Sequence, residues 1–341
     1  MTKTISNKNK IFFTFNISET IKDFLFSLVI LFIMVMIILN PALFSNGTIS
    51  GLKLFFYSVF PGLFPFMFLT KLLTEIGFVY KFSQKLTPVS KKLFGTNGIS
   101  LYVFFMSILS GYPIGAQLIG DLKSKNLISD SEAKKMSLFC TTSGPIFVIG
   151  AVGVGMLKSF KLGLIIYISH ISSSLLLGLV SKFIFKSNTS PFYPISHHKE
   201  QNLLSSTLTK TINSITLVGA YITIFYLLSE LIFKLNIFLF ISKIIFPPLS
   251  KLNISKQQVE GLLYGIVEVT RGCKELSHTL NYTTISIISG LISFGGLSIN
   301  MQMLAFLKNT QIKTHSFIFG KVVCAMISIL ICQTILFIIW I

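Results

Sequence analysis

The sequence predicts an all-α polytopic membrane protein made of two related halves with broken or re-entrant helices, plus one extra N-terminal transmembrane helix. Of the 341 residues, 52% are hydrophobic and only 12% are charged, whereas a soluble domain carries about a quarter charged residues. Several apolar stretches approach the roughly 20 residues that a helix needs to cross a bilayer. The two halves also repeat one order of apolar runs and breaks.

The first predicted transmembrane helix covers residues 23–44, after a segment 1–22 that we expect in the cytoplasm. Its centre, Phe24–Leu39, contains no charged residue. Lysines before an apolar run resemble a secretion signal, but this run is longer than the usual 7–15 residues of such a signal. We therefore expect a retained helix.

The predicted halves are residues 52–185 and 211–341, separated by a polar linker at 186–210. In each half an apolar run ends at a short polar motif, which is SGYPIGAQL (Ser110–Leu118) in the first and EVTRGCKEL (Glu268–Leu276) in the second. A long apolar segment interrupted by glycines and a last hydrophobic helix follow each motif. Interrupted helices at matching positions are typical of the repeats of transporters, where they mark the binding site.

The lysines bear on the orientation of these halves. If the N-terminus is cytoplasmic and Ile99–Leu122 is a re-entrant hairpin, the lysine-containing connections 77–98, 118–136 and 186–210 all face the cytoplasm. Basic connections are typical of that side, and the second half is then inverted relative to the first. Simple spanning by every segment gives a similar bias, so the lysines permit both arrangements.

The net charge of +18 suits contact with anionic lipid headgroups, and no motif predicts nucleic-acid binding. Four cysteines (Cys140, Cys273, Cys324 and Cys332) lie singly in or beside apolar segments. The pair His197-His198 lies in the linker without a further ligand at the spacing of a metal site. We expect no metal and no cofactor, and the lack of HExxH, GxSxG or paired aspartates argues against an enzyme.

The first break, Ser110-Gly111-Tyr112-Pro113, must open an apolar helix, because glycine allows unusual backbone angles and proline lacks a donor. Opened backbone within a membrane is tolerated where it is buried in protein or lines a wet cavity. Gln117 and Asp121 add a polar face that favours the cavity over a simple kink. The second break, Thr142-Ser143-Gly144-Pro145, is typical of a helix start, whose free N–H groups attract anions.

The second half supplies further candidates. Asn300 and Gln302 lie in the apolar run after Phe294-Gly-Gly, where an unpaired amide is costly and needs a partner or a ligand. Glu260, Tyr264, Glu268, Arg271 and Glu275 fall on one stripe if their helix is continuous. Arg271 is suited to bidentate binding of a carboxylate. The alternatives are a solvated charged face or an ion-pair set of Glu268, Arg271 and Glu275.

SGYPIGAQ, the SGPIFVIGAVGVG run, the Glu268–Gly272 segment and FGGLSINMQ together resemble the YlbJ-type sporulation integral membrane proteins. Those proteins belong to the nucleoside-recognition (Gate-domain) group, which is related in repeat design to concentrative nucleoside carriers. The resemblance extends from about Leu52 to the C-terminus. It implies a membrane around the developing spore and export of dipicolinic acid from the mother cell toward the forespore.

We therefore predict an integral membrane transporter of a small anion, with dipicolinate suspected, whose partners are this solute and the lipid bilayer. A homo-oligomer is compatible with the sequence. A nucleoside carrier is the alternative and would favour Gln117, Asn300, Gln302 and Glu268 as partners of the solute. A structural spore-membrane protein, in which the breaks serve packing alone, is the third hypothesis.

Overall fold

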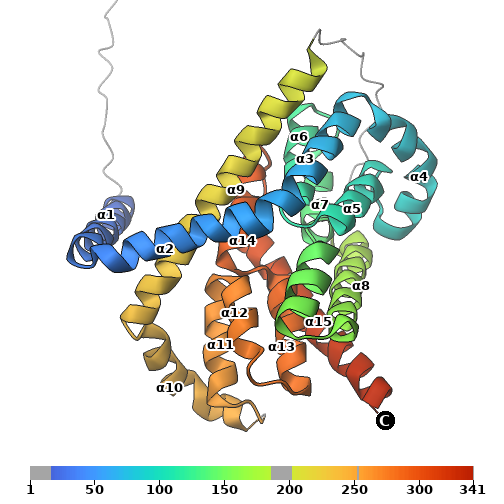
Figure 1. Cartoon of the computed structure of the whole chain (residues 1–341). Helices are drawn as coiled ribbons and strands as arrows, with labels where there is room; N and C mark the ends of the chain where they lie inside the picture. The colour runs from blue at the N-terminus through green and yellow to red at the C-terminus, as the bar shows by residue number, and fades with distance from the viewer. Residues whose placement is uncertain (1–16, 186–201, 252, 341) are drawn as a thin grey trace, which may run out of the picture. The chain divides into compact units, whose positions relative to one another are not determined.

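The computed structural model describes residues 17–185, 202–251 and 253–340, and within these ranges the regular structure is helical throughout (Figure 1). The chain divides into two compact units, 1–46 and 47–341. The predicted linker lies largely outside the described residues, and helix α9 already begins at Leu203.

The first unit contains helix α1 (Ile17–Leu39) and the start of α2 (Pro41–Leu54). The helix breaks at Asn40-Pro41, because proline lacks the N–H that would continue the ladder but is well suited to a helix start. From residue 21 to 39 the α1 side chains are exposed on nearly all faces, although they are apolar. A helix that is hydrophobic all round is typical of a membrane span.

The second unit holds both halves, and their helices follow the same order. Each half begins with a long apolar helix and continues with a shorter helix, two short helices joined by a tight turn, a second pair of helices separated by a break and a final long helix. In the first half these are the end of α2 with η1 (Phe55–Val59) and α3 (Phe60–Glu75), then α4 (Phe78–Phe94), α5 (Ile99–Ser110), α6 (Ile114–Ser124), α7 (Asp130–Phe139), η2 (Ile146–Met156) and α8 (Phe160–Ile184). In the second half they are α9 (Leu203–Lys234), α10 (Ile237–Ser250), α11 (Lys256–Val267), α12 (Val269–Leu276), α13 (Tyr282–Phe294), α14 (Gly296–Phe306) and α15 (Thr314–Trp340).

The contacts between the halves are reciprocal. Helix α6 of the first half packs on α14 of the second, and α12 of the second packs on η2 of the first. Likewise α8 packs on α13 while α15 packs on α7. Such exchange of equivalent contacts is the property of a twofold relation. The hairpins α5–α6 and α11–α12 lie toward opposite ends of the unit (Figure 1), as expected for inverted repeats.

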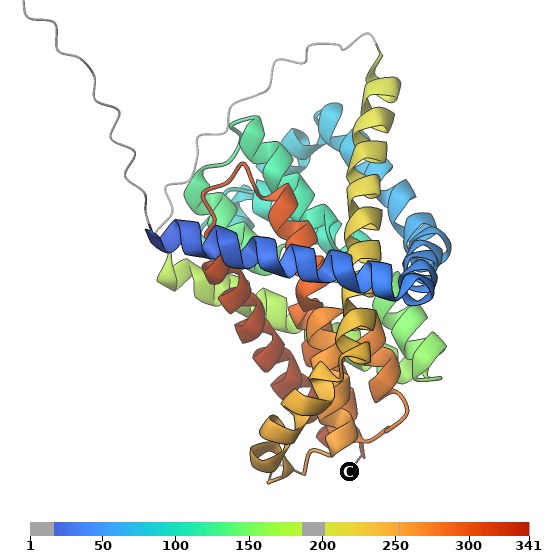
Figure 2. The same cartoon turned by 90° about the vertical axis from the view of Figure 1, so that its left-hand side faces the viewer.

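Length and composition identify six helices that could cross a membrane in the described residues, or seven if the bent pair α4 and α5 counts as one. Helices α9 and α15 run through much of the height of the second unit (Figures 1 and 2). Many large apolar side chains point outward, whereas buried hydroxyls pack the interior, for example Ser289 and Ser328, whose Oγ atoms are 2.7 Å apart. Small residues of this kind allow membrane helices to approach closely.

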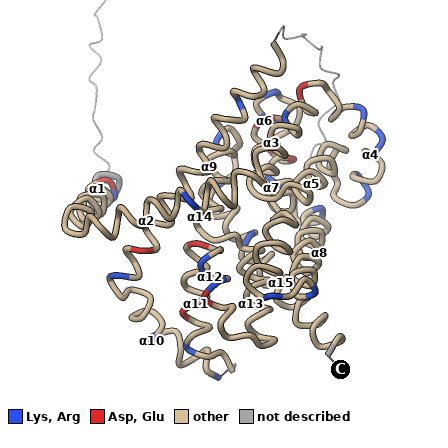
Figure 3. The backbone as a smooth tube through the Cα atoms, in the orientation of Figure 1, with Lys and Arg blue, Asp and Glu red and all other residues tan. Residues whose placement is uncertain are grey.

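Basic residues gather at the end of the second unit where α4, α6 and α7 lie (Figure 3). Ion pairs tie the connections together there, since Glu75 binds Lys125 at 2.9 Å and Lys210 at 3.4 Å. Lys182 also donates to the carbonyl of Lys92 at 2.8 Å. The lysine-containing connections 77–98 and 118–136 therefore share one end of the second unit.

The stripe predicted from Glu260 to Glu275 is wrong, because the helix breaks at Glu268, whose φ of −140° and ψ of 112° are extended. Helices α11 and α12 fold back on each other at a pair of glycines. A Cβ on Gly272 would lie 2.2 Å from the Cα of Gly265, so no larger residue fits without displacing a backbone. The turn of this hairpin is at Glu268, the first residue of the EVTRGCKEL motif.

Candidate functional site

The two breaks of the first half meet in space. Gly111 ends α5 with a φ of +84°, which a side chain would strain. A Cβ on Gly111 would lie 2.4 Å from the backbone nitrogen of Gly144. Ser107 joins the same contact, because its Oγ accepts from the Thr142 N–H at 2.9 Å. The motifs around residues 110–113 and 142–145 thus form one structure.

The two breaks of the second half meet in the same way. Gly296, with a φ of +68°, lies against the end of α11, and a Cβ there would approach the Gly265 carbonyl oxygen to 3.0 Å. The Glu268 carboxylate starts α12 by accepting from the N–H groups of Thr270 and Arg271 at 3.1 and 2.7 Å. A carboxylate is favourable at this helix N-terminus, where free N–H groups and the helix dipole meet it.

Tyr112 and His170 connect the breaks of the two halves. The Tyr112 hydroxyl donates to the Ile292 carbonyl near the end of α13. The Ser143 N–H donates to His170 Nε2 at 2.8 Å, and His170 Nδ1 lies 2.8 Å from Ser293 Oγ. Both links cross from the first repeat to the second, so the four breaks form a single buried assembly.

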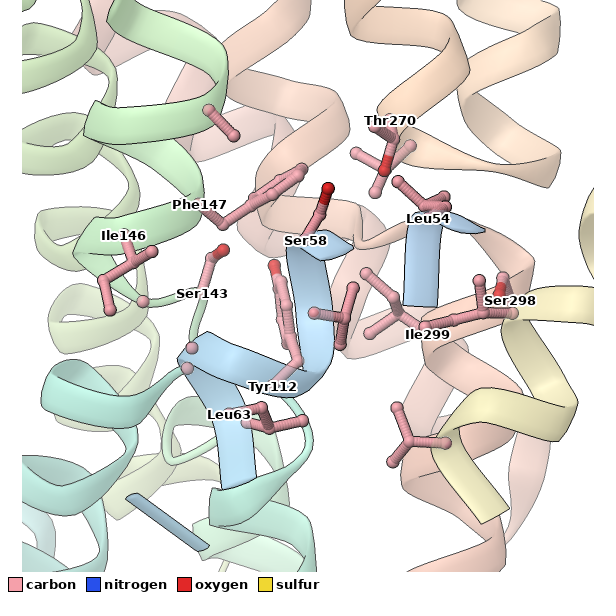
Figure 4. Close-up of a pocket in the computed structure, with 18 of the residues that line it drawn as sticks. Leu54, Ser58, Leu63, Tyr112, Ser143, Ile146, Phe147, Thr270, Ser298 and Ile299 are labelled. Carbon is pink, nitrogen blue, oxygen red and sulfur yellow. The ribbon is translucent and has the colours of Figure 1, made fainter. Parts of the chain in front are cut away.

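A cavity of about 260 Å³ lies at this assembly, and its walls are mainly apolar. Ser58, Tyr112 and Ser143 line this cavity together with Phe147, Leu63 and Ile299 (Figure 4). The lining includes seven of the residues predicted from the sequence: Ser110, Gly111, Tyr112, Ser143, Gly144, Glu268 and Gln302. An apolar pocket with a few polar groups is typical of a site for a small solute.

Two hydroxyls of the cavity wall have no hydrogen-bond partner among the described residues. These are Ser110 Oγ and Ser143 Oγ, both inaccessible to solvent. A buried polar atom without a partner costs about 1–3 kcal/mol. Two residues of the cavity wall therefore carry buried hydroxyls that no described group satisfies.

Arg271 lies outside the cavity lining. Its Nη1 is bonded to Glu230 Oε1 at 2.8 Å and to Ser229 Oγ at 2.9 Å, both on α9. Its guanidinium also lies over the rings of Tyr264 and Phe233, at 4.6 and 5.2 Å from their centroids. The ion-pair set of Glu268, Arg271 and Glu275 suggested from the sequence is wrong, because Arg271 pairs with Glu230 and Glu268 receives only the backbone N–H of Arg271.

The remaining predicted residues lie around the cavity rather than on its wall. Gln117 donates to Ser214 Oγ at 2.8 Å, in a cluster with Lys71 between α3, α6 and α9. The Asn300 amide donates to the carbonyls of Phe294 and Gly296, which the break between α13 and α14 exposes, while its Oδ1 has no partner in the described residues. Thr142, Pro113 and Pro145 shape the two first-half breaks.

The prediction from sequence missed Lys321 and His170. Lys321 is 2% exposed and donates to the Thr141 carbonyl, and its Nζ lies 5.5 Å from the centroid of the Tyr112 ring. It is the sole Lys, Arg, Asp or Glu of α15. A lone charge within a membrane span is a signal of function that could have identified it.

No group of three or more His, Cys, Asp or Glu side chains suited to a metal occurs within the described ranges. The four cysteines are free and buried. The pair His197-His198 lies outside the described residues. The groups that could contact a ligand in the cavity are therefore hydroxyls, amides, one carboxylate and apolar side chains.

Fold and site together define an integral membrane protein whose buried cavity is enclosed by broken helices of two repeats. Comparison with known proteins confirms the resemblance noted in the sequence. Residues 56–160 match the Gate family, described as nucleoside recognition. The chain is 27% identical over 315 residues to the sporulation integral membrane protein YlbJ of Bacillus subtilis (strain 168), covering 85% of this chain and 77% of that protein. No solved structure matches the chain.

Proposed function

We propose that the protein is a membrane carrier of a small planar anion, and that dipicolinate moving from the mother cell toward the forespore is its solute. The observation that carries this proposal is the convergence of four helix breaks on one cavity that contains unpartnered hydroxyls.

The chemistry of dipicolinate suits this cavity. A dianion cannot cross the hydrocarbon of a bilayer unaided, because transfer of a charge from water is far too costly. The hydroxyls of Ser110 and Ser143 can donate to a carboxylate, and Phe147, Leu63 and Ile299 can cover an aromatic ring. The resemblance to YlbJ-type proteins supports the sporulation membrane as the location and dipicolinate as the solute.

A nucleoside is the second candidate, favoured by Glu268 and Gln302 on the cavity wall and by the description of the matching family. A carboxylate and an amide are suitable partners for sugar hydroxyls and base edges. However, both carboxylate oxygens of Glu268 already accept backbone N–H groups, which reduces what remains for a solute.

Transport by purified protein in proteoliposomes tests the proposal. We expect uptake of labelled dipicolinate that unlabelled dipicolinate displaces and uridine does not. Replacing both Ser110 and Ser143 by alanine should weaken dipicolinate binding about 10- to 100-fold, the usual effect of lost hydrogen bonds to a charged group. Ser181→Ala is the matched control, because Ser181 is buried but bonds the Gly178 carbonyl in its own helix.

The other outcomes identify the alternatives. Uptake of uridine without binding of dipicolinate would favour the nucleoside carrier. Folded protein that moves neither compound would favour the structural role. In cells that lack the protein, we expect dipicolinate to be made but to fail to enter spores, which should then be sensitive to heat.

A further inference from the structure

Lys321 is a buried lysine in the first third of the membrane helix α15. It is 2% exposed, and the rest of α15, from Thr314 to Trp340, contains no other Lys, Arg, Asp or Glu. Its ammonium donates to the Thr141 carbonyl and lies 5.5 and 5.8 Å from the ring centroids of Tyr112 and Phe317. A carbonyl and two rings are neutral, so none of these contacts balances the charge.

Lys321 also has no acidic partner within the part of the chain that the structure describes, where the ion pairs involve other residues. Arg271, the other cation near the breaks, is paired with Glu230 at 2.8 Å. A charge buried without a counter-charge is costly, and proteins pair such charges or use them. Lys321 is therefore the cation that a ligand could neutralise.

The contacts of Lys321 belong to the back of the cavity wall. Tyr112, whose ring Lys321 contacts, lines the cavity. Thr141, whose carbonyl accepts from Lys321, lies two residues before the lining residue Ser143. Ser143 is fully buried and its Oγ lacks a partner, as does Ser110 Oγ. Lys321 itself does not line the cavity, so its positive charge lies behind the wall that Tyr112 and Ser143 form and would act on a ligand through that wall.

Glu268 does not cancel this charge. Its carboxylate also lines the cavity, but it accepts two backbone N–H groups at the start of α12. The helix N-terminus therefore balances much of its negative charge. The wall at Ser110 and Ser143, with Lys321 packed against Tyr112 and Thr141 behind it, is then the side of the cavity that attracts an anion.

We infer that Lys321 is the residue that supplies positive charge to a bound carboxylate, with the hydroxyls of Ser110 and Ser143 as its direct donors. This inference rests on the proposed function. It assigns the selectivity for an anion to Lys321 and not to Arg271. The ligand class is a small aromatic carboxylate whose ring packs against the apolar walls.

The experiment compares dipicolinate with pyridine-2,6-dicarboxamide, a neutral molecule of nearly the same shape, by calorimetric binding to the purified full chain in detergent. The wild-type protein should prefer dipicolinate. Lys321→Met keeps the length of the side chain, removes its charge and avoids a buried polar group, so it should fold. It should weaken dipicolinate binding about 10- to 100-fold while leaving the affinity for the diamide unchanged.

Two further variants complete the test. Lys321→Arg should retain the preference for dipicolinate, because it keeps the charge. Lys71→Gln is the control for loss of a buried lysine, since Lys71 bonds Ser214 and the Lys210 carbonyl and does not line the cavity. It should leave the preference intact.

Equal loss of both ligands in Lys321→Met would overturn the inference and assign Lys321 a purely structural role. If Arg271→Gln lost the preference for dipicolinate and Lys321→Met kept it, Arg271 rather than Lys321 would be the residue that supplies positive charge to the ligand. Wild-type protein that binds neither ligand would instead refute the proposed function itself. The two failures can therefore be told apart.

Discussion

The ion pair between Arg271 and Glu230 offers a direct measure of what holds the second hairpin in place. Arg271 is on α12, directly after the break, and Glu230 is near the end of α9. Their side chains are 16% and 23% exposed, so solvent screens the pair only partly. We predict that Arg271→Gln loosens the contact between the hairpin and α9.

The magnitude follows from the contacts. A hydrogen bond to a charged group contributes about 1.5–3 kcal/mol, and each cation–π contact with Tyr264 and Phe233 adds about 0.5–1 kcal/mol. Arg271→Gln should therefore lower the free energy of unfolding by on the order of 3 kcal/mol. In a double-mutant cycle with Glu230→Gln, the coupling free energy should be about 1–3 kcal/mol.

The assay is equilibrium unfolding of the purified variants in mixed micelles, with Lys234→Gln as a control on the same helix. Membrane insertion should survive, because the apolar spans are unchanged. No coupling between Arg271 and Glu230, together with normal stability and lost dipicolinate binding in Arg271→Gln, would refute this reasoning. Arg271 would then be a residue that binds the solute, as its chemistry first suggested.

Three further predictions concern the hairpins and the cavity. Gly272→Ala should prevent the close contact with Gly265 and lower the amount of folded protein in the membrane, as measured by fluorescence-detected size exclusion, because a Cβ would lie 2.2 Å from the Gly265 Cα. In a cysteine-free background, cysteines at the exposed positions Lys92 and Lys125 should be labelled from one side of the membrane and those at Lys256 and Ser277 from the other. Labelling of Lys92 and Lys125 from opposite sides would exclude the re-entrant hairpin. Tyr112→Phe should cost about 1 kcal/mol in thermal unfolding because it loses the bond to the Ile292 carbonyl, and an unchanged midpoint would contradict that contact.

Much of the architecture could be predicted from the sequence, because glycine, proline and hydroxyl residues within apolar runs determine where a membrane helix opens. The breaks at Gly111, Gly144 and Gly295 follow from these residues. The break at Glu268 could not be located in the same way. No glycine or proline marks it, and an acid at a helix N-terminus is indistinguishable in sequence from an acid on a continuous helical face.

The composition of the cavity was harder to predict, because it depends on contacts between residues far apart in the chain. Arg271 was the most conspicuous charge, but its partner Glu230 precedes it by 41 residues and lies on another helix. Lys321 contacts Thr141, 180 residues away in the sequence. The hydropathy of the sequence can identify a lone charged residue in a membrane helix. Its position relative to a cavity depends on tertiary packing and cannot be predicted in this way.

The two repeats share their breaks but satisfy them differently. In the second half, Glu268 receives the first N–H groups of α12, Asn300 donates to the carbonyls at the start of α14, and Arg271 is paired on α9. Asn300 Oδ1, away from the cavity wall, has no partner among the described residues. In the first half, Ser110 and Ser143 keep hydroxyls without partners at the cavity. A duplicated scaffold can specialise in this way, because breaks that are satisfied internally give a fixed wall whereas unsatisfied ones await a ligand.

This asymmetry agrees with the extent of the family match. The segment that matches the Gate family, 56–160, contains both first-half breaks and the apolar residues Leu63 and Phe147. Lys321, on the last helix of the second half, reaches these breaks through Thr141 and Tyr112. Recognition of the solute would then reside mainly in the first repeat, with one cation contributed by the second. Substitutions in α5, α6 and η2 should consequently alter solute selectivity, while those in α11 and α12 should alter stability.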